Sequence, residues 1–249
     1  MRPRFTSLVR STLSLVPKNL RSIPLSPDTS THIVEAIWPT SPTPPRNDSG
    51  NNEVLPLRTF IQETLRHSQT SCSTLQVALY YLVLIKSHVP FYDSITEQPY
   101  DCRSSHAIQC GRHMFLAALI IASKYLQDCI YSAYAWSKIS GLDTLEINQN
   151  EIAFLFAVNW NLHVTEEVYK RWVDFVNKFT PSQPRSPGGA AQQVYERQCY
   201  NFRRIILNLS PDLDNLEQLN LWSPAMSPTL ELPPRSLHAS GGARWRFSV

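Results

Sequence analysis

Met114-Phe-Leu-Ala-Ala-Leu-Ile-Ile-Ala-Ser-Lys-Tyr-Leu126 is the most apolar helical stretch of the chain, and a single lysine interrupts it near its end. A helix that is hydrophobic on all sides belongs at the centre of a helical domain. Burying the ammonium group of Lys124 without a partner would cost several kcal/mol. We therefore expect a central helix whose last turn brings Lys124 to the surface or to a carboxylate.

The composition around this stretch divides the 249-residue chain into three parts. Residues 53–180 are dense in apolar side chains and are expected to form one domain. Residues 1–52 are basic and rich in Ser and Pro, with a short helix expected at 31–38. Residues 181–249 are rich in Pro, with an amphipathic helix expected at 190–209. Apart from these two helices, both flanks are expected to be disordered tails.

The central part shows helical spacing of apolar residues and no strand alternation, so the predicted fold class is all-α. Trp136, Trp160 and Trp172 stand at helix-packing positions and are expected in the core. Six helices are expected. The first spans 56–68, the second is capped by Ser73 or Thr74 and ended by Pro90, and the third spans 111–126. The fourth begins at Ser132 and ends at Gly141, the fifth is capped by Asp143 with Glu146, and the sixth is capped by Thr165 and ended by Pro181.

Charge and motifs argue against several classes of function. Residues 53–179 carry ten Lys and Arg against twelve Asp and Glu, a net charge of −2, so this part has no excess of positive charge for a nucleic-acid partner. No apolar run is long enough to span a bilayer, and no membrane partner is expected. The seven glycines form no phosphate loop and no nucleophile stands with a base, so neither catalysis nor a cofactor is predicted.

The five cysteines include no C-x-x-C pair, which is typical of reduced thiols. Cys102, His106, Cys110 and His113 place four metal-ligating residue types within twelve residues. Structural zinc sites usually bring their ligands in close pairs across a turn. These four residues lack that spacing, and we expect no metal.

The first 25 residues contain five basic residues and no Asp or Glu. This composition suits a mitochondrial transit peptide, and it equally suits a solvated basic tail or a nuclear-import patch. The sequence alone leaves these alternatives open.

Lys124 and Glu151 are expected near each other, because the end of the central helix and the start of the fifth helix can emerge on one side of a compact bundle. One interpretation is an intramolecular salt bridge, worth about 1 kcal/mol or less if it is exposed. The other is a docking pair that offers a donor and an acceptor to a partner's backbone through charge-assisted hydrogen bonds.

Longer motifs favour the second interpretation. Ala122-Ser-Lys-Tyr-Leu126, Asn150-Glu-Ile-Ala-Phe-Leu-Phe156 and Asn159-Trp-Asn-Leu-His-Val164 resemble the cyclin box. The segments 110–128 and 135–142, with Glu146-Ile-Asn, are similar to fungal PCL-type cyclins, the regulators of the phosphate-pathway cyclin-dependent kinase. The resemblance covers the central part, about half of the chain.

The resemblance implies a single five-helix cyclin box with flanking helices. It implies that Lys124 bonds backbone carbonyls beside the mobile helix of a kinase and that Glu151 accepts hydrogen bonds from nearby kinase amides. Tyr125 and Asp128 are expected on the same surface. The implied function is that of a non-catalytic subunit. Such a subunit binds and activates a cyclin-dependent kinase and directs it to substrates in cell-cycle or nutrient-response control, in the nucleus and cytoplasm.

The sequence departs from the wider family at one place. Many cyclins pair an arginine of the first helix with an aspartate of the second, but here Val83 and Leu84 stand where Asp-Arg would be expected. Arg58, at the arginine position, is therefore expected to face solvent or a different acid. We assign no substrate-docking groove around the first helix.

Ser-Pro and Thr-Pro pairs are frequent in the flanks, and proline-directed kinases read such dipeptides. The equally weighted alternative is that proline-rich tails contain them by chance. The predicted phosphorylation sites are Ser26, Ser41, Thr43, Ser186, Ser223 and Ser227.

Two functions of other classes remain as alternatives. One is a helical interaction module of cyclin fold without a kinase partner, such as a transcription-associated protein. The other is a mitochondrial helical protein, which would require cleavage of the basic N-terminal segment on import.

Overall fold

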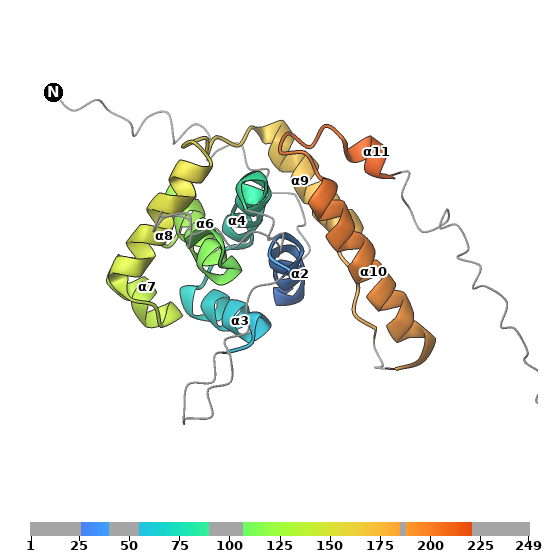
Figure 1. Cartoon of the computed structure of the whole chain (residues 1–249), viewed down its shortest axis with the longest axis horizontal. Coiled ribbons are helices and arrows are strands. Elements are labelled where there is room, and N and C mark those ends of the chain that lie inside the picture. Colours follow the sequence, from blue (N-terminus) through green and yellow to red (C-terminus); the bar gives the residue numbers. More distant parts are fainter. Residues whose placement is uncertain (1–25, 40–54, 90–106, 185–187, 221–249) are drawn as a thin grey trace, which may run out of the picture.

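The computed structural model describes residues 26–39, 55–89, 107–184 and 188–220 (Figure 1). Within these ranges the regular elements are helices and no strand occurs, which confirms the all-α prediction. The helices are α2 (Pro27–Ile37), α3 (Leu57–Ser68), α4 (Cys72–Ile85), the 3-10 helix η1 (Lys86–His88), α6 (Gly111–Leu126), α7 (Ala133–Ser140), α8 (Thr144–Ala157), α9 (Glu166–Phe179), α10 (Gly189–Asn208) and α11 (Leu216–Asn220).

Helix α6, which carries the apolar stretch, lies at the centre of the molecule, as its sequence predicts. Every residue from Met114 to Ser123 is between 0 and 4% exposed. It packs most extensively on α4, which is itself buried over most of its length, and next on α8. None of the described helices combines the length and the apolar composition needed to cross a bilayer.

Several predicted helix ends are confirmed. The Ser132 hydroxyl accepts a hydrogen bond from the Ala135 N–H at 3.2 Å and so begins α7. Gly141 ends that helix in the left-handed conformation, with φ +77°, where a residue without Cβ is favoured. Thr165 caps α9 by accepting from the Val168 N–H at 3.3 Å.

Two predicted caps are wrong. Ser71 begins α4, because its hydroxyl accepts from the Thr74 N–H at 3.2 Å, and Ser73 lies inside the helix. Asp143 occupies the N-cap position of α8 but makes no side-chain cap hydrogen bond. Glu146 does not complete a capping box because its carboxylate pairs with a histidine of α6.

Helix α2 belongs to the core, although it lies within the segment expected to be an N-terminal tail. Ser26 begins it by accepting from the Asp28 N–H at 3.0 Å, and Pro27 suits the first helical position. Ile33 and Val34 are fully buried, and α2 contacts α3, α4, α6 and α10. The packed part of the chain therefore extends beyond the central segment.

Arg58 of α3 pairs with Asp28 of α2 and remains 56% exposed. This confirms that Arg58 is not buried alone and finds a different acid. The pair also fixes α2 against α3. The hydrogen bond from Arg58 lowers the pKa of Asp28, and this effect exceeds that of burial, which raises it.

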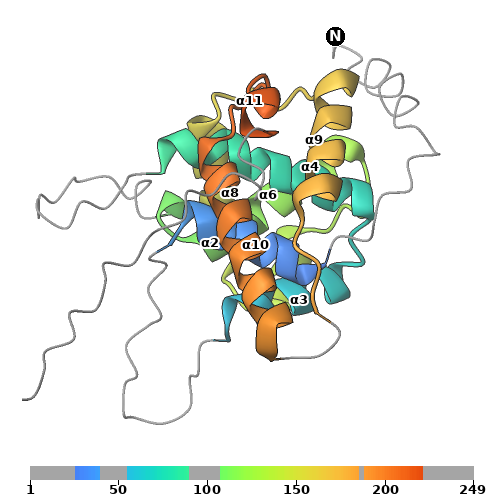
Figure 2. The same ribbon diagram turned by 90° about the vertical axis from the view of Figure 1, so that its right-hand side faces the viewer.

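Helices α9 and α10 lie on the side of α2 and α4 that faces the viewer in Figure 2. Phe202 of α10 stacks on Phe175 of α9, with ring centroids 6.2 Å apart. Lys86 donates hydrogen bonds of 2.6–3.0 Å to the carbonyls of residues 206, 207 and 209 at the end of α10. A cation at this end of a helix is favourable, so Lys86 holds α10 against the end of α4.

Candidate partner-docking site

Lys124 and Glu151, 27 positions apart in the sequence, form a direct ion pair. Lys124 extends from the last turn of α6 and Glu151 from the middle of α8, and these two helices pack against each other. The lysine side chain is 48% exposed and the glutamate side chain 14% exposed. The intramolecular salt bridge therefore describes the unbound chain, and its lysine side chain is partly exposed to solvent.

Asp128, expected on the same surface, contacts the start of α4. It follows Gln127, which ends α6 in the left-handed conformation. Its carboxylate accepts hydrogen bonds from the Ser71 N–H at 3.4 Å and from the Thr74 hydroxyl. Partial burial raises the pKa of Asp128, but these hydrogen bonds outweigh it and the pKa lies below its ordinary value. Asp128 thus ties the end of α6 to the start of α4.

Tyr125 is half-buried beside Lys124 and also contacts the chain itself. Its ring meets Tyr81 edge-on, with centroids 6.3 Å apart, and its hydroxyl accepts from the Val164 N–H at 3.5 Å. These contacts hold the segment after α8 next to the end of α6. A docking role for Tyr125 and Asp128 stays a prediction.

Three large apolar side chains that follow Glu151 in the sequence are exposed, and sequence reasoning did not assign them to the site. Ile152, Phe156 and Trp160, which we call the α8 stripe, are 51%, 65% and 60% exposed and are spaced four residues apart. The rings of Phe156 and Trp160 meet edge to face, with centroids 6.1 Å apart. The expected burial of Trp160 is wrong, because Asn159 and Trp160 adopt positive φ and turn the chain outward after α8.

The sequence contains a signal for the exposure of Ile152 and Phe156. The buried face of α8 includes Phe154 and Leu155, so the neighbouring large apolar residues of the same short helix must fall on other faces. Apolar side chains gathered on an exposed face mark an interaction surface. Trp136 and Trp172, by contrast, are 2% and 0% exposed, as predicted.

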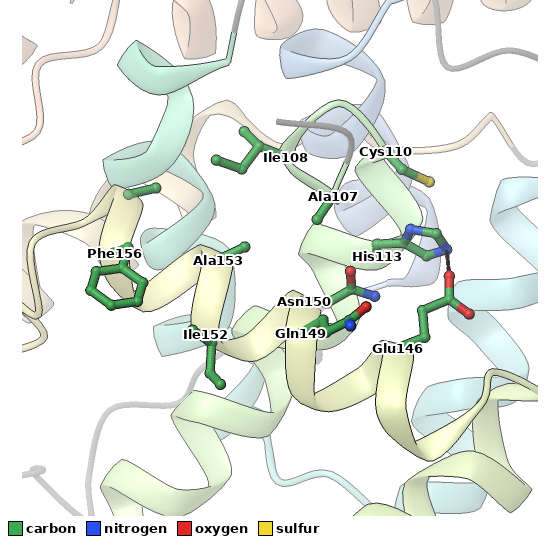
Figure 3. A pocket seen from close by; sticks show the side chains of 11 residues that line it. Ala107, Ile108, Cys110, His113, Glu146, Gln149, Asn150, Ile152, Ala153 and Phe156 are labelled. Atoms are coloured by element: carbon green, nitrogen blue, oxygen red, sulfur yellow. Dashed lines mark ion pairs between the residues drawn. The ribbon is translucent and has the colours of Figure 1, made fainter. Parts of the chain in front are cut away.

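An open pocket of about 900 Å³ lies between α8 and the segment that leads into α6 (Figure 3). Ile152 and Phe156 form part of its apolar wall. At its polar end, Nε2 of His113 lies 3.2 Å from Oε1 of Glu146, and Cys110 stands beside His113. The pocket thus joins two members of the α8 stripe to a cluster of titratable groups.

Comparison with known proteins identifies the central helices. Residues 48–162 match the family model Cyclin, and this range contains α3 to α8. This segment matches the cyclin-box family. Lys124 and Glu151 lie in two packed helices of the matched segment.

Relatives of the cyclin box occur in fungi and plants. They include the G1/S-specific cyclin pas1 of Schizosaccharomyces pombe, 31% identical over 140 residues, PHO85 cyclin-5 of Saccharomyces cerevisiae, 28% identical over 129 residues, and Cyclin-U4-1 of Arabidopsis thaliana, 24% identical over 131 residues. These alignments cover 56%, 52% and 52% of this chain and 31%, 53% and 59% of the relatives, less than two thirds of each. No solved structure matches the chain.

Other predicted sites fall only partly within the described residues. Cys102 and His106 lie outside them, and the described residues contain no group of three or more His, Cys, Asp or Glu side chains that could hold a metal ion. Among the predicted phosphorylation sites, Ser26 caps α2. The remaining sites lie outside the described residues, as does the basic segment 1–25; they are Ser41, Thr43, Ser186, Ser223 and Ser227.

Proposed function

We propose that this chain is a non-catalytic regulatory subunit that binds and activates a cyclin-dependent Ser/Thr protein kinase. The observation that carries the proposal is the ion pair of Lys124 and Glu151 inside a cyclin box, next to the exposed α8 stripe. Relatives named as a G1/S-specific cyclin and a PHO85 cyclin support a PCL-type kinase partner and a role in cell-cycle or nutrient-response control.

The pair suits recognition of a kinase backbone. In the unbound chain Glu151 holds the Lys124 ammonium over α8, so less side-chain freedom is lost on binding. On docking, the ammonium donates to partner carbonyls and the carboxylate accepts from partner N–H groups, which gives charge-assisted hydrogen bonds. The α8 stripe contributes apolar area, and buried aromatic anchors such as Trp160 carry much of the energy of an interface.

Docking would activate the kinase by stabilising one of its conformers. Contacts of this chain with the kinase's mobile helix would stabilise the conformer in which the kinase's own Lys–Glu pair forms and its activation loop opens. The catalytic residues belong to the kinase, and the bound kinase could phosphorylate the Ser-Pro and Thr-Pro positions of this chain. We place the complex in the nucleus and cytoplasm, without a nucleic-acid or membrane partner.

Affinity purification tests the proposal. The tagged full chain is purified from cells that express it naturally, beside Lys124→Glu and a matched control, Lys138→Glu, which makes the same charge change at an exposed lysine of α7. We expect mass spectrometry to find a cyclin-dependent kinase with the native chain and the control but not with Lys124→Glu. Absence of any kinase from the native sample, or equal recovery with Lys124→Glu, would overturn the proposal.

A further inference from the structure

Cys110, His113 and Glu146 form a cluster that the docking function does not use. Cys110 occupies the N-cap position of the 16-residue helix α6, and His113 stands about one turn further along. Figure 3 shows the Cys110 sulfur beside the His113 ring, whose Nε2 is 3.2 Å from Oε1 of Glu146 on α8. In many proteins a thiol beside an imidazole, which is itself oriented by a carboxylate, is activated as a thiolate nucleophile.

The charges around the cluster favour a thiolate facing an imidazolium. Burial raises the pKa of the Cys110 thiol, but the His113 imidazole and the backbone amides at the start of α6 outweigh it and lower the pKa overall. Interaction with Cys110 raises the pKa of His113, with help from Glu146 and against burial and the positive charge of Arg112. A helix N-terminus further stabilises a negative sulfur.

The cluster opens onto the pocket of about 900 Å³, so a small reagent can reach it. The same pocket is lined by Asn150, which is only 4% exposed and whose Nδ2 has no hydrogen-bond partner. A buried amide donor without an acceptor is unfavourable, and it is satisfied when a ligand brings an oxygen into the pocket. Asn150 is therefore an independent indication that this end of the pocket receives an oxygen-bearing group.

A second cysteine of the chain provides a contrast. Cys199 also lies near a histidine, with its sulfur 3.4 Å from Nε2 of His32, but it is 8% exposed. Burial is the largest influence there and raises the pKa of Cys199. Proximity to a histidine alone thus does not activate a thiol in this chain.

We propose that Cys110 is a modification site, at which a thiolate held by His113 and Glu146 reacts with hydrogen peroxide and with small alkylating electrophiles that enter the pocket. The sulfur attacks one peroxide oxygen, so that an S–O bond forms as the O–O bond breaks. The sulfur gives up two electrons, which the peroxide accepts. The leaving hydroxide takes the proton of the His113 imidazolium, and the products are a sulfenic acid, water and neutral His113. Asn150 donates a hydrogen bond to the departing oxygen.

Alkylation kinetics resolved by residue test this proposal. The reduced full chain is treated with iodoacetamide between pH 6.5 and 8.5, and mass spectrometry follows each cysteine, with the exposed Cys129 as internal reference. We expect the ratio of the Cys110 rate to the Cys129 rate to rise by about tenfold as the pH falls across this range. His113→Gln should abolish that rise and leave the Cys129 rate unchanged, and Glu146→Gln should reduce it.

A second readout keeps the proposal falsifiable if the His113 variant folds poorly. After limiting hydrogen peroxide, a dimedone-type probe should label Cys110 of the native chain before the other cysteines. A constant ratio of the Cys110 and Cys129 rates across the pH range would overturn the proposal, and so would the absence of sulfenic acid at Cys110. These outcomes do not depend on kinase binding.

Discussion

The side chain of Lys124 is 48% exposed, whereas that of Glu151 is 14% exposed. Water screens such a pair, and ordering two long side chains costs entropy, so exposed pairs contribute about 1 kcal/mol or less. At the scale of single residues, the pair therefore matters for the position of its charges more than for the stability of the fold.

This balance gives a prediction for stability. Lys124→Ala and Glu151→Ala should each lower the free energy of unfolding by about 1 kcal/mol or less. Urea denaturation followed by circular dichroism measures the change. A loss of more than about 3 kcal/mol would show instead that the pair holds a buried part of the structure together.

Some contacts and exposures of single residues could be predicted from the sequence, and others could not. The apolar length of α6 and the motif around Glu151 sufficed to predict that Lys124 meets a carboxylate. The exposure of Trp160 and the contacts of Asp128 with α4 could not be predicted. Both depend on residues in the left-handed conformation, Trp160 and Gln127, whose side chains give no turn signal in the sequence.

At the scale of elements, a polar cluster around His32 joins α2 to α10. Nε2 of His32 lies 3.3 Å from the Tyr195 hydroxyl and 3.4 Å from the Cys199 sulfur. Nδ1 of His32 lies 3.2 Å from a nitrogen of Arg203. Arg203 also pairs with Glu35. Because Arg203 faces the ring from α10, the contact between the two helices favours a neutral histidine.

The cluster predicts a pH dependence of stability. Burial and Arg203 lower the pKa of His32, against the opposing charges of Glu35 and Asp28. The unfolded chain then binds the proton more tightly, so stability should decrease as the pH falls below about 6.5 towards the lower native pKa, and this contribution should level off beyond it. Thermal unfolding between pH 7.5 and 5.5 measures the slope.

His32→Asn should reduce that slope, and His88→Asn, at an exposed histidine of η1, should leave it unchanged. Comparison of each variant with the native chain removes the contributions of other groups, such as His113, whose raised pKa acts in the opposite direction. Equal slopes for the native chain and His32→Asn would contradict the account of this interface.

The contact of α2 with α6 gives a packing prediction. A Cβ on Gly111 would lie 2.8 Å from Cγ1 of Val34 and 3.2 Å from Cβ of Trp38, both of which are buried. Gly111→Ala should therefore lower the free energy of unfolding by about 1–2 kcal/mol, because the overpacking outweighs the gain in helix propensity.

A double-mutant cycle measured by urea denaturation provides the control. Val34→Ala removes the methyl groups that Gly111→Ala would meet, so the double variant should lose less stability than the two single variants together. Strict additivity of the two losses would show that α2 does not press on Gly111.

Among the elements, the helix ends with local signals at Ser132, Gly141 and Thr165 were predicted correctly, whereas the caps predicted for α4 and α8 were wrong. A helix at 31–38 that packs on the domain or on a partner was predicted, but the start of α2 at Pro27 and its contact with α10 were not. Its buried face is short, and it is covered by α10, whose residues lie more than 150 positions later in the chain. The amphipathic pattern of 190–209 predicts a helix there, but the pattern does not show which part of the chain that helix contacts.

At the scale of the whole molecule, the flanking helices leave the proposed docking face open. Helices α2 and α10 pack together on the side of α6 opposite α8 (Figures 1 and 2). Lys86 and the pair of Arg58 with Asp28 fix them there. The α8 stripe and the Lys124–Glu151 pair therefore remain accessible on the other side, where a kinase could dock without displacing a described helix.

Reconstituted kinase activity tests this account most directly. The phosphorylation rate of a Ser-Pro peptide by the purified kinase subunit is measured as the chain is titrated in, for the native chain, Lys124→Glu and Lys138→Glu. We predict saturable activation by the native chain and by Lys138→Glu, and a shift of the Lys124→Glu curve to concentrations at least about tenfold higher, the effect of a loss of 1.4 kcal/mol in binding. No activation by the native chain, or superimposable curves for all three proteins, would contradict it.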